Sequence, residues 1–344
     1  MTAPVDAPAL ASRVGHYYRL DDTFEVGREK IREFARAVQD YHPAHWDEAA
    51  AAALGYTGLV APLTFVSIPA VGVNKHLFET AVIGYDMFVQ TEQVFEQHRP
   101  IVAGDRLTTD VELSSVRRVA GKDLITVTNT FTDEFGERVH TMRTTVVGIT
   151  SEQVDPALTH AVRSSMMYGV SVFGRADDDA SDYTHTPMRP GTEVPIARRA
   201  RPSANTRSFD QLVVGAELPL RDFQLSRGDL VNYAGVSGDN NPIHWDTAIA
   251  RLAGLPDVVA HGMLTMGIGA GFVSAWTGDP GAVTRYGARL SQAAVVEATD
   301  GGAIEFTGKV KSVDSETRSA VIAIVAKSGG RKIFGLSTTE VTFL

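Results

Sequence analysis

The sequence of 344 residues contains no cysteine. Disulfides, thiolate metal sites and cysteine nucleophiles are therefore excluded, and a reducing compartment such as the cytoplasm is expected. Basic residues are also in deficit, because 32 Lys and Arg against 41 Asp and Glu give a formal net charge of −9. A general nucleic-acid binder needs a basic face, so we expect no nucleic-acid partner.

Long hydrophobic runs are scarce as well. The stretch Val258–Trp276 is largely apolar and near the length of a membrane span, but it contains His261 and several glycines. Helices that are apolar all round also occur in soluble cores, where small residues let other backbone approach closely. We therefore expect a buried helix here and no membrane span. The segment Met1–Arg13 lacks the basic and apolar regions of a signal peptide.

What the sequence does contain is an internal repeat. Phe34–Asp47 (FARAVQDYHPAHWD) and Tyr233–Asp246 (YAGVSGDNNPIHWD) are identical at six of fourteen positions, with a constant offset of 199 residues. The offset continues without a gap through three further identities, Gly55/Gly254, Val60/Val259 and Ala61/Ala260. A register kept this long favours two like domains in one chain over two unrelated segments that enter helices.

Both halves end in paired strand patterns. Alternating segments flank a turn in each half, at Asp133–Gly136 between Leu124–Phe131 and Arg138–Ile149, and at Ser328–Gly330 between Val321–Ala326 and Lys332–Phe343. Such pairs predict β-hairpins. Each half also has an apolar helix pattern, Ala61–Glu79 and Gly262–Trp276. The sequence therefore predicts an α+β fold in which each antiparallel sheet wraps round a central helix.

We predict one domain at residues 1–150, a linker at 151–206 and a second domain at 207–344. The linker is weakly patterned and holds Asp177–Asp179, several prolines and at most a short helix around Ala157–Met167. We expect the two sheets to join edge to edge, which would cover exposed strand edges and make the chain an intramolecular pseudo-dimer. Pairing of whole chains into a homodimer is left open.

A candidate site lies in the loop Gly238–His244 (GDNNPIH), which holds Asp239 and His244. Pro242 fixes its own φ and restricts Asn241, whose side chain can bond the backbone, so this loop can direct a carboxyl and an imidazole to one point. The spacing alone is weak evidence. Asp239 could instead cap the helix that begins near Asp246 and leave His244 satisfied in the core.

The second element of the site is the start of the apolar helix at His261 and Gly262. A helix N-terminus offers free backbone N–H groups, and Gly262 would let a substrate approach closely. Elimination of water from a 3-hydroxyacyl thioester needs a base at C2, an acid for the 3-hydroxyl and a donor for the enolate-like oxygen. His244, Asp239 and the Gly262 amide can supply these, with Asn241 and His261 in support and without a cofactor or metal.

These motifs resemble a known family. Leu230–Asp246 and His261–Gly281 resemble the hydratase-2 motif of MaoC-like hot-dog proteins. The second half looks like the HadB subunit of (3R)-hydroxyacyl-ACP dehydratases, and the first half is similar to HadA through Glu29–Glu33, Gly58–Phe65 and Arg99–Asp105. The resemblance implies a fused HadA–HadB chain with a double hot-dog fold, a catalytic second half and a first half that shapes the acyl channel. It also implies acyl-carrier-protein substrates, often of long chain, in type II fatty-acid elongation of the mycolic-acid kind.

Asp40 and His45 depart from that resemblance. A-type subunits usually lack the catalytic pair, yet the first half keeps both residues in register. Pro62 and Leu63, however, stand where the second half has His261 and Gly262. Proline has no N–H to donate and leucine crowds the helix start, so we expect this N-half pair to be inactive.

Three alternatives stay open. Asp239, His244 and His261 could form a two-His-one-carboxylate metal site. The same motif serves (R)-specific enoyl-CoA hydratases of β-oxidation or polyester metabolism, so coenzyme A could be the carrier. The chain could also bind acyl thioesters without turnover. An acidic carrier protein would need a local basic patch, for which the candidates are Arg198, Arg199, Arg201, Arg285 and Arg289.

Overall fold

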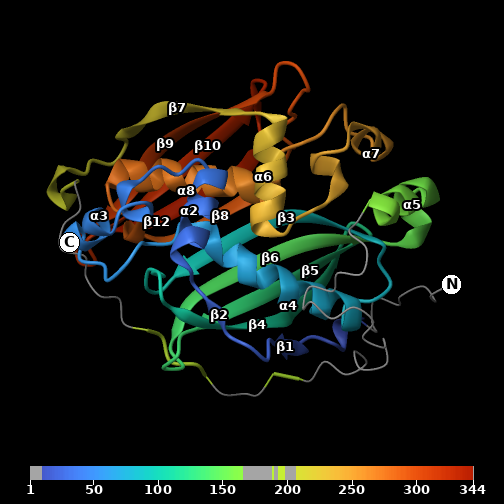
Figure 1. Ribbon diagram of the computed structural model, residues 1–344, viewed down its shortest axis with the longest axis horizontal. Helices are drawn as coiled ribbons and strands as arrows, with labels where there is room; N and C mark the ends of the chain where they lie inside the picture. The colour runs from blue at the N-terminus through green and yellow to red at the C-terminus, as the bar shows by residue number, and fades with distance from the viewer. Residues whose placement is uncertain (1–9, 166–187, 190–192, 198–206, 344) are drawn as a thin grey trace.

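The computed structural model describes residues 10–165, 188–189, 193–197 and 207–343 (Figure 1). Within these residues a 12-stranded sheet runs in the order β1-β4-β5-β6-β3-β8-β12-β10-β9-β7, with β2 and β11 off this path. Its first five strands belong to the first half of the chain and its last five to the second. The predicted α+β architecture, with one antiparallel sheet and one long helix in each half, is confirmed.

The first half supplies strands β1 (Tyr17–Arg19), β2 (Phe24–Glu25), β3 (Met87–Gln97), β4 (Arg106–Val119), β5 (Lys122–Thr132) and β6 (Arg138–Ile149). Its helices are α2 (Arg28–Ala37), α3 (Glu48–Ala53) and α4 (Ser67–Thr80), with 3₁₀ turns at Pro43–His45 and Leu63–Val66. The predicted hairpin round Asp133–Gly136 is the β5–β6 pair.

The second half supplies strands β7 (Glu217–Leu225), β8 (Val283–Leu290), β9 (Gly302–Asp314), β10 (Ser319–Ser328), β11 (Arg331–Lys332) and β12 (Phe334–Thr342). Its helices are α6 (Arg227–Ser237), α7 (Thr247–Leu252) and α8 (Gly262–Thr277), with a 3₁₀ turn at Pro242–His244. The predicted hairpin round Ser328–Gly330 is present between β10 and the later strands β11 and β12.

The repeat inferred from the sequence is visible in the elements. The 3₁₀ turn of the first histidine loop, Pro43–His45, and that of the second, Pro242–His244, begin 199 residues apart. The helices that follow them, α3 and α7, also begin 199 residues apart. Asp47 and Asp246 each cap the following helix by accepting a backbone N–H two residues on. Asp246, and not Asp239, therefore caps the helix α7.

The two halves meet edge to edge, as expected, through β3 and β8. These strands pair antiparallel from Glu92 opposite Arg289 to Glu96 opposite Arg285. The same residues form ion pairs across the seam, with N–O distances of 3.6 Å for Arg289–Glu92 and for Arg285–Glu96. Two of the arginines considered for carrier docking are thus engaged by carboxylates. The other three, Arg198, Arg199 and Arg201, lie outside the described residues.

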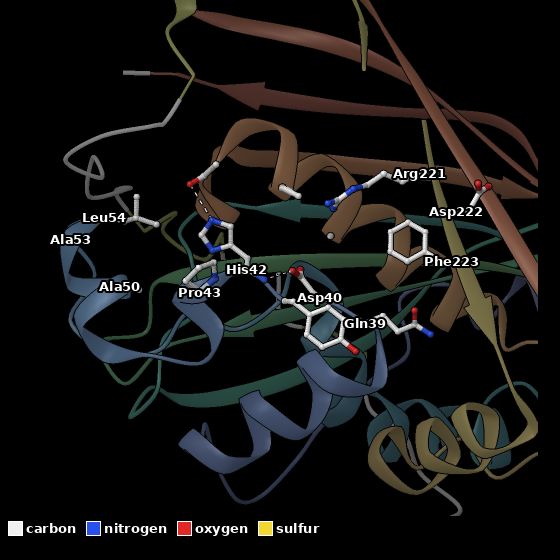
Figure 2. A pocket seen from close by; sticks show the side chains of 14 residues that line it. Gln39, Asp40, His42, Pro43, Ala50, Ala53, Leu54, Arg221, Asp222 and Phe223 are labelled. Atoms are coloured by element: carbon white, nitrogen blue, oxygen red, sulfur yellow. Dashed lines mark hydrogen bonds between the residues drawn. The ribbon is translucent and has the colours of Figure 1, made fainter. Parts of the chain in front are cut away.

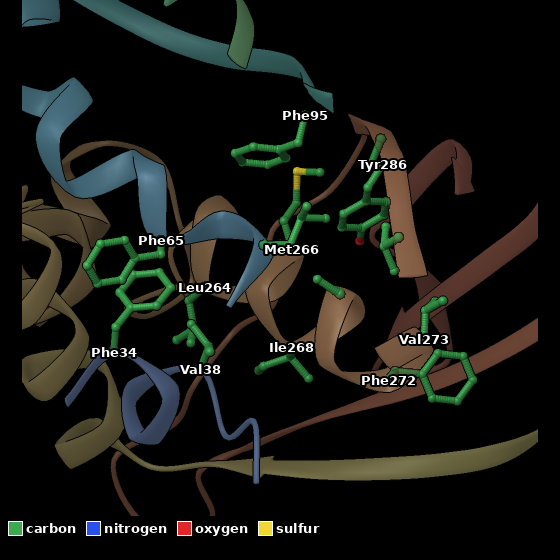
Figure 3. Packing of buried hydrophobic residues seen from close by; sticks show 14 of the residues in the cluster. Phe34, Val38, Phe65, Phe95, Leu264, Met266, Ile268, Phe272, Val273 and Tyr286 are labelled. Atoms are coloured by element: carbon green, nitrogen blue, oxygen red, sulfur yellow. The ribbon is translucent and has the colours of Figure 1, made fainter. Parts of the chain in front are cut away.

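One hydrophobic core serves both halves. Phe34 lies in the last turn of α2, and Val38 directly follows the helix. Both pack in one cluster with Leu264, Met266 and Ile268 of α8 (Figure 3). The cluster also contains Phe95 of β3 and Tyr286 of β8, both fully buried. Burying a large apolar side chain contributes about 1.5–3 kcal/mol, so this shared cluster ties the two halves together.

The two central helices differ at their starts. Helix α8 covers the predicted Gly262–Trp276 and ends at Gly278, whose φ of 80° is left-handed. Helix α4 begins at Ser67 rather than Ala61, after the 3₁₀ turn Leu63–Val66. Pro69 has no N–H and cannot donate to the carbonyl four residues earlier. The α-helix therefore starts at Ser67, because Pro69 then lies in the first turn, where N–H groups have no partner within the helix in any case. Among the described helices, none has the length and apolar character needed to cross a bilayer.

Part of the predicted linker packs on the domains. Helix α5 (Pro156–Ser165) lies close to the short helix expected there, and its Leu158 shares an apolar cluster with Ile249 of α7. Further along, Arg189 forms ion pairs with Asp110 and Glu112 of β4. The acidic run Asp177–Asp179 lies outside the described residues, and the exact domain boundaries remain a prediction.

Candidate active site

The loop after α6 is stiffened as the sequence suggested. Gly238 ends the helix with a left-handed φ of 81°. The side-chain oxygen of Asn241 accepts the backbone N–H of Ile243 at 3.2 Å and so caps the 3₁₀ turn that Pro242 opens. The carboxylate of Asp239 is half-buried and accepts the Asn241 backbone N–H at 3.4 Å. These bonds hold Asp239 and His244 in a fixed relation.

His244 is held as a neutral base. Its Nδ1 lies 2.7 Å from the carbonyl oxygen of Val259, an acceptor, so the ring proton sits on Nδ1 and the Nε2 lone pair is left open. Burial lowers the pKa of His244 below its usual value, although the nearby charge of Asp239 acts in the opposite direction. At neutral pH the ring therefore has the protonation state that removal of a proton from a substrate requires.

His261 supports both residues. Its ring is fully buried and stacks on His244, with 3.7 Å between the ring centroids and 26° between the planes. Its Nε2 donates to the main-chain carbonyl of Asp239 at 3.1 Å. Burial, followed by the neighbouring His244, lowers the pKa of His261 to about 4. This neutral ring fixes the backbone of Asp239 and one face of His244.

The three side chains converge. One carboxylate oxygen of Asp239 and one nitrogen of each ring, His244 and His261, all lie within 4.8 Å of one another. No ion pair between Asp239 and His244 is present in the described part of the chain. The same three residues are also a possible set of metal ligands, but one nitrogen of His261, Nε2, already donates to the Asp239 carbonyl.

Gly262 begins α8 beside His261. The first bond within the helix is donated by Thr265 to the His261 carbonyl at 3.1 Å, so the amides of Gly262 and Met263 precede the helical ladder. A Cβ on Gly262 would lie 2.7 Å from Leu290 Cδ1 and 3.6 Å from Gln90 Oε1. The glycine therefore lets the start of α8 approach β8 and β3, a contact that the sequence did not reveal. The access for substrate expected at Gly262 stays a prediction.

The N-half pair has the same residues in a different state. His45 Nδ1 lies 2.6 Å from the Val60 carbonyl oxygen, but its Nε2 lies 3.2 Å from Asp40 Oδ2 in a buried ion pair. Burial opposes both charges. The mutual attraction outweighs it, lowering the pKa of Asp40 and raising the pKa of His45. The charged forms of Asp40 and His45 are therefore favoured in the first loop, whereas burial favours the neutral ring of His244 in the second loop.

A cavity of about 800 Å³ lies beside Asp40 (Figure 2). Three elements line it besides the N-half loop: α3, the segment Arg221–Phe223 of β7, and small residues of α8 such as Gly271. Both ring nitrogens of His42 are used there, since Nδ1 accepts the Ala44 N–H at 3.2 Å and Nε2 donates to the Gly278 carbonyl at 3.0 Å. The contribution of β7 and α8 was not predicted. The run of small residues in α8 was the only sequence signal for it.

Comparisons with known proteins agree with this architecture. Residues 12–142 match the family model described as "FAS1-like, dehydratase domain region", and residues 211–326 match the "MaoC like domain". A protein of Mycolicibacterium paratuberculosis named only as a UPF0336 protein is 42% identical over 172 residues, which are 49% of this chain and 97% of the relative.

Two solved structures extend the comparison to the whole chain. A Mycobacterium tuberculosis protein described as having a double hotdog fold superposes with a TM-score of 0.64 at 15% identity, covering 96% of both chains, and this likeness shows the fold. A structure described as a MaoC-like dehydratase is 60% identical, with a TM-score of 0.92 over 98% of this chain and 100% of that chain. The expected double hot-dog fold is confirmed, and the chain belongs to the MaoC-like dehydratase family.

Proposed function

We propose that this protein is a (3R)-hydroxyacyl-thioester dehydratase, which removes water reversibly to give a trans-2-enoyl thioester. Asp239 and His244 are the catalytic residues, the Gly262 amide binds the thioester carbonyl, and Asn241 and His261 position the loop. The observation that carries the proposal is the convergence of Asp239, His244 and His261 within 4.8 Å at the start of α8. Membership of a dehydratase family supports the reaction class.

The reaction follows from the proton positions. The open Nε2 of His244 takes the C2 proton, and the electron pair moves toward the carbonyl, whose oxygen gains negative charge. The Gly262 amide donates to that oxygen, an interaction whose loss typically costs on the order of 3–4 kcal/mol in the transition state. The proposal includes that the carboxyl of Asp239 carries a proton when substrate is bound and gives it to the 3-hydroxyl as the C3–O bond breaks and water leaves. Each well-placed acid or base contributes roughly 10²–10⁴-fold.

The N-half pair is assigned a structural role in this proposal. An imidazolium cannot take a proton and an ionised carboxylate cannot donate one, and the pair Asp40–His45 is held in those states. Leu63, whose side chain is buried in the core, stands where the other half has Gly262, and Pro62 stands in place of His261. The first half then contributes to substrate binding, and the second half carries out the reaction.

The carrier and setting are further parts of the proposal. We propose acyl carrier protein as the carrier, in cytoplasmic type II fatty-acid elongation, on the strength of the resemblance of the two halves to HadA and HadB. The second candidate is an (R)-specific enoyl-CoA hydratase, since the site motif is common to both. Rates on crotonyl thioesters of acyl carrier protein and of coenzyme A, measured at equal concentrations, distinguish them. Association of whole chains into homodimers is checked by light scattering.

The test of the reaction is hydration of a crotonyl thioester, followed by loss of its ultraviolet absorbance. Asp239→Asn and His244→Ala should each lower kcat by about 10²–10⁴-fold. Surface variants Asp300→Asn and His160→Ala are the matched controls and should match the parent. Full activity in chelator, with no stoichiometric metal in the protein, is expected. Parental rates in both site variants would instead support a protein that binds acyl thioesters without turning them over.

A further inference from the structure

The start of α8 is contacted from the other half of the molecule by Gln90 of β3. In a regular strand Gln90 and Gln93 would lie on opposite faces. The pairing of β3 with β6 shifts register between Gln90 and Glu92, and such a bulge turns the two glutamines to the same face. Their side chains are in fact hydrogen-bonded, Gln90 Nε2 donating to Gln93 Oε1 at 2.8 Å.

The orientation of the Gln90 amide is set by this network. Gln93 Nε2 donates to the Val94 carbonyl at 3.4 Å, and a carbonyl can only accept, so Gln93 Oε1 is the oxygen that also accepts from Thr144 Oγ1 at 2.8 Å. Gln90 Nε2 lies in addition 3.5 Å from the sulfur of Met263 in the first turn of α8. With its N–H groups so directed, the half-buried Gln90 presents Oε1 toward Gly262, 3.6 Å from the point where a Cβ would be.

Gln90 Oε1 has no hydrogen-bond donor among the residues that the structure describes. An acceptor left unmatched at a partly buried position costs free energy unless water or a ligand supplies a donor. Beside it, the Gly262 amide is a donor outside the helical ladder. The start of α8 thus offers one donor from the second half and one acceptor from the first.

We propose that Gln90 Oε1 accepts the N–H of the cysteamine amide in the pantetheine arm of the substrate. The inference rests on the proposed function. A 3-hydroxyacyl pantetheine thioester has two hydrogen-bond donors near its carbonyl, the 3-hydroxyl and the amide N–H two carbons beyond the sulfur. In the proposed reaction Asp239 lies at the 3-hydroxyl, whereas the amide N–H has no acceptor assigned to it, so an acceptor beside the carbonyl site matches the amide. Gln90 is then a positioning residue through which the first half recognises the carrier arm.

Two crotonyl thioesters isolate this contact. One carries N-acetylcysteamine, and the other carries the 2-acetoxyethyl arm, in which an ester oxygen replaces the N–H at almost the same size. The parent protein should show a kcat/KM roughly 3–10-fold higher for the amide arm, the range expected for one neutral hydrogen bond. Gln90→Met, which keeps the side-chain length, should remove this preference by lowering only the rate with the amide arm.

Two further variants control for folding. Gln90→Glu retains an acceptor oxygen and should keep the preference for the amide arm. Thr91→Val changes the neighbouring residue of β3, whose hydroxyl donates to the Thr145 carbonyl, and should leave both rates as in the parent. Equal loss on both arms in Gln90→Met, or no arm preference in the parent, would overturn the inference. If the parent hydrates neither thioester, the proposed function itself fails, which is a separate result.

Discussion

The two histidine loops of this chain hold the same pair of residue types, an aspartate and a histidine, in different surroundings. Asp40 and His45 form a buried ion pair, whereas Asp239 and His244 stay open beside the start of α8. In both loops the histidine Nδ1 donates to a valine carbonyl, so the ring orientation is shared. The difference lies in Nε2, which is 3.2 Å from a carboxylate oxygen in one loop and has no ion-pair partner among the described residues in the other. The same motif can therefore be a structural ion pair or a candidate acid and base.

Substitutions at the following helix account for part of the difference. In the second half His261 donates to the Asp239 carbonyl, and Trp245 Nε1 donates to the next one, that of Asn240. Pro62 replaces His261 in the first half, and there the indole of Trp46 donates to the Asp40 carbonyl instead. The position before each aspartate is alike, because Gln39 and Gly238 both adopt a left-handed φ, of 53° and 81°. The two loops therefore differ in the side chain that donates to the aspartate carbonyl.

The largest contrast is expected in activity when each pair is neutralised. The double variant Asp40→Asn/His45→Gln should retain kcat within about 3-fold of the parent, because no step uses these groups. Asp239→Asn/His244→Gln should lose about 10²–10⁴-fold. Hydration of a crotonyl thioester measures both, with circular dichroism as the check on folding. A collapse of activity in the N-half variant would make that pair a second active site.

The next contrast concerns the donor at the helix start. Gly262→Ala/Leu290→Ala relieves the contact with Leu290 and keeps the N–H, so its kcat should stay near that of the parent. Gly262→Pro/Leu290→Ala differs by the loss of that N–H, and proline is tolerated at the first position of a helix. We expect its kcat to be about 10²–10³-fold lower. Equal rates in the two double variants would remove Gly262 from the mechanism.

Loss of the histidine should lower stability more in the first loop than in the second, which is the reverse of the order expected for activity. His45→Ala leaves the carboxylate of Asp40, only 5% exposed, without its partner, and should cost about 3–5 kcal/mol in the free energy of unfolding. His244→Ala loses a neutral hydrogen bond and a ring stack, and should cost about 1–2 kcal/mol. Urea denaturation of both variants gives the comparison. Losses of the same size would mean that the two pairs are equally structural.

The smallest effects are those of pH. The lowered pKa of His244 places the acid limb of kcat/KM below pH 6.5, because protonation removes the base. The raised pKa of His45 stabilises the fold below the unfolded value of about 6.5, and this contribution is lost as pH rises through the folded pKa. The lowered pKa of Asp40 contributes above about pH 3.9 and is lost as pH falls through its folded pKa.

The coupling between Asp40 and His45 should therefore be greatest between about pH 4 and 6.5. A double-mutant cycle with Asp40→Asn and His45→Gln, repeated by urea denaturation across pH 4–9, measures it. Coupling that grew steadily above pH 7 would contradict the assignment of an ion pair.

The sequence predicted best those features of the structure that depend on interactions between residues close together in the chain. The repeat, the hairpins, the long helix from Gly262 and the turn capped by Asn241 follow from periodicity and turn residues, and the structure has them. Asp40 and His45 were also found, but their ion pair depends on burial. Gln90 and Leu290 were missed because a β-bulge and the pairing of β3 with β8 bring them to Gly262. Contacts between residues so far apart leave no local signal.

The most direct test is a crystal structure with a non-reactive amide analogue of a 3-hydroxyacyl pantetheine thioester, in which N–H replaces the thioester sulfur and the carbonyl is kept. The account predicts its carbonyl oxygen within hydrogen-bond distance of the Gly262 amide, C2 beside His244 Nε2 and the 3-hydroxyl at Asp239. An analogue that binds instead with its reacting carbons in the cavity beside Asp40 would contradict the account.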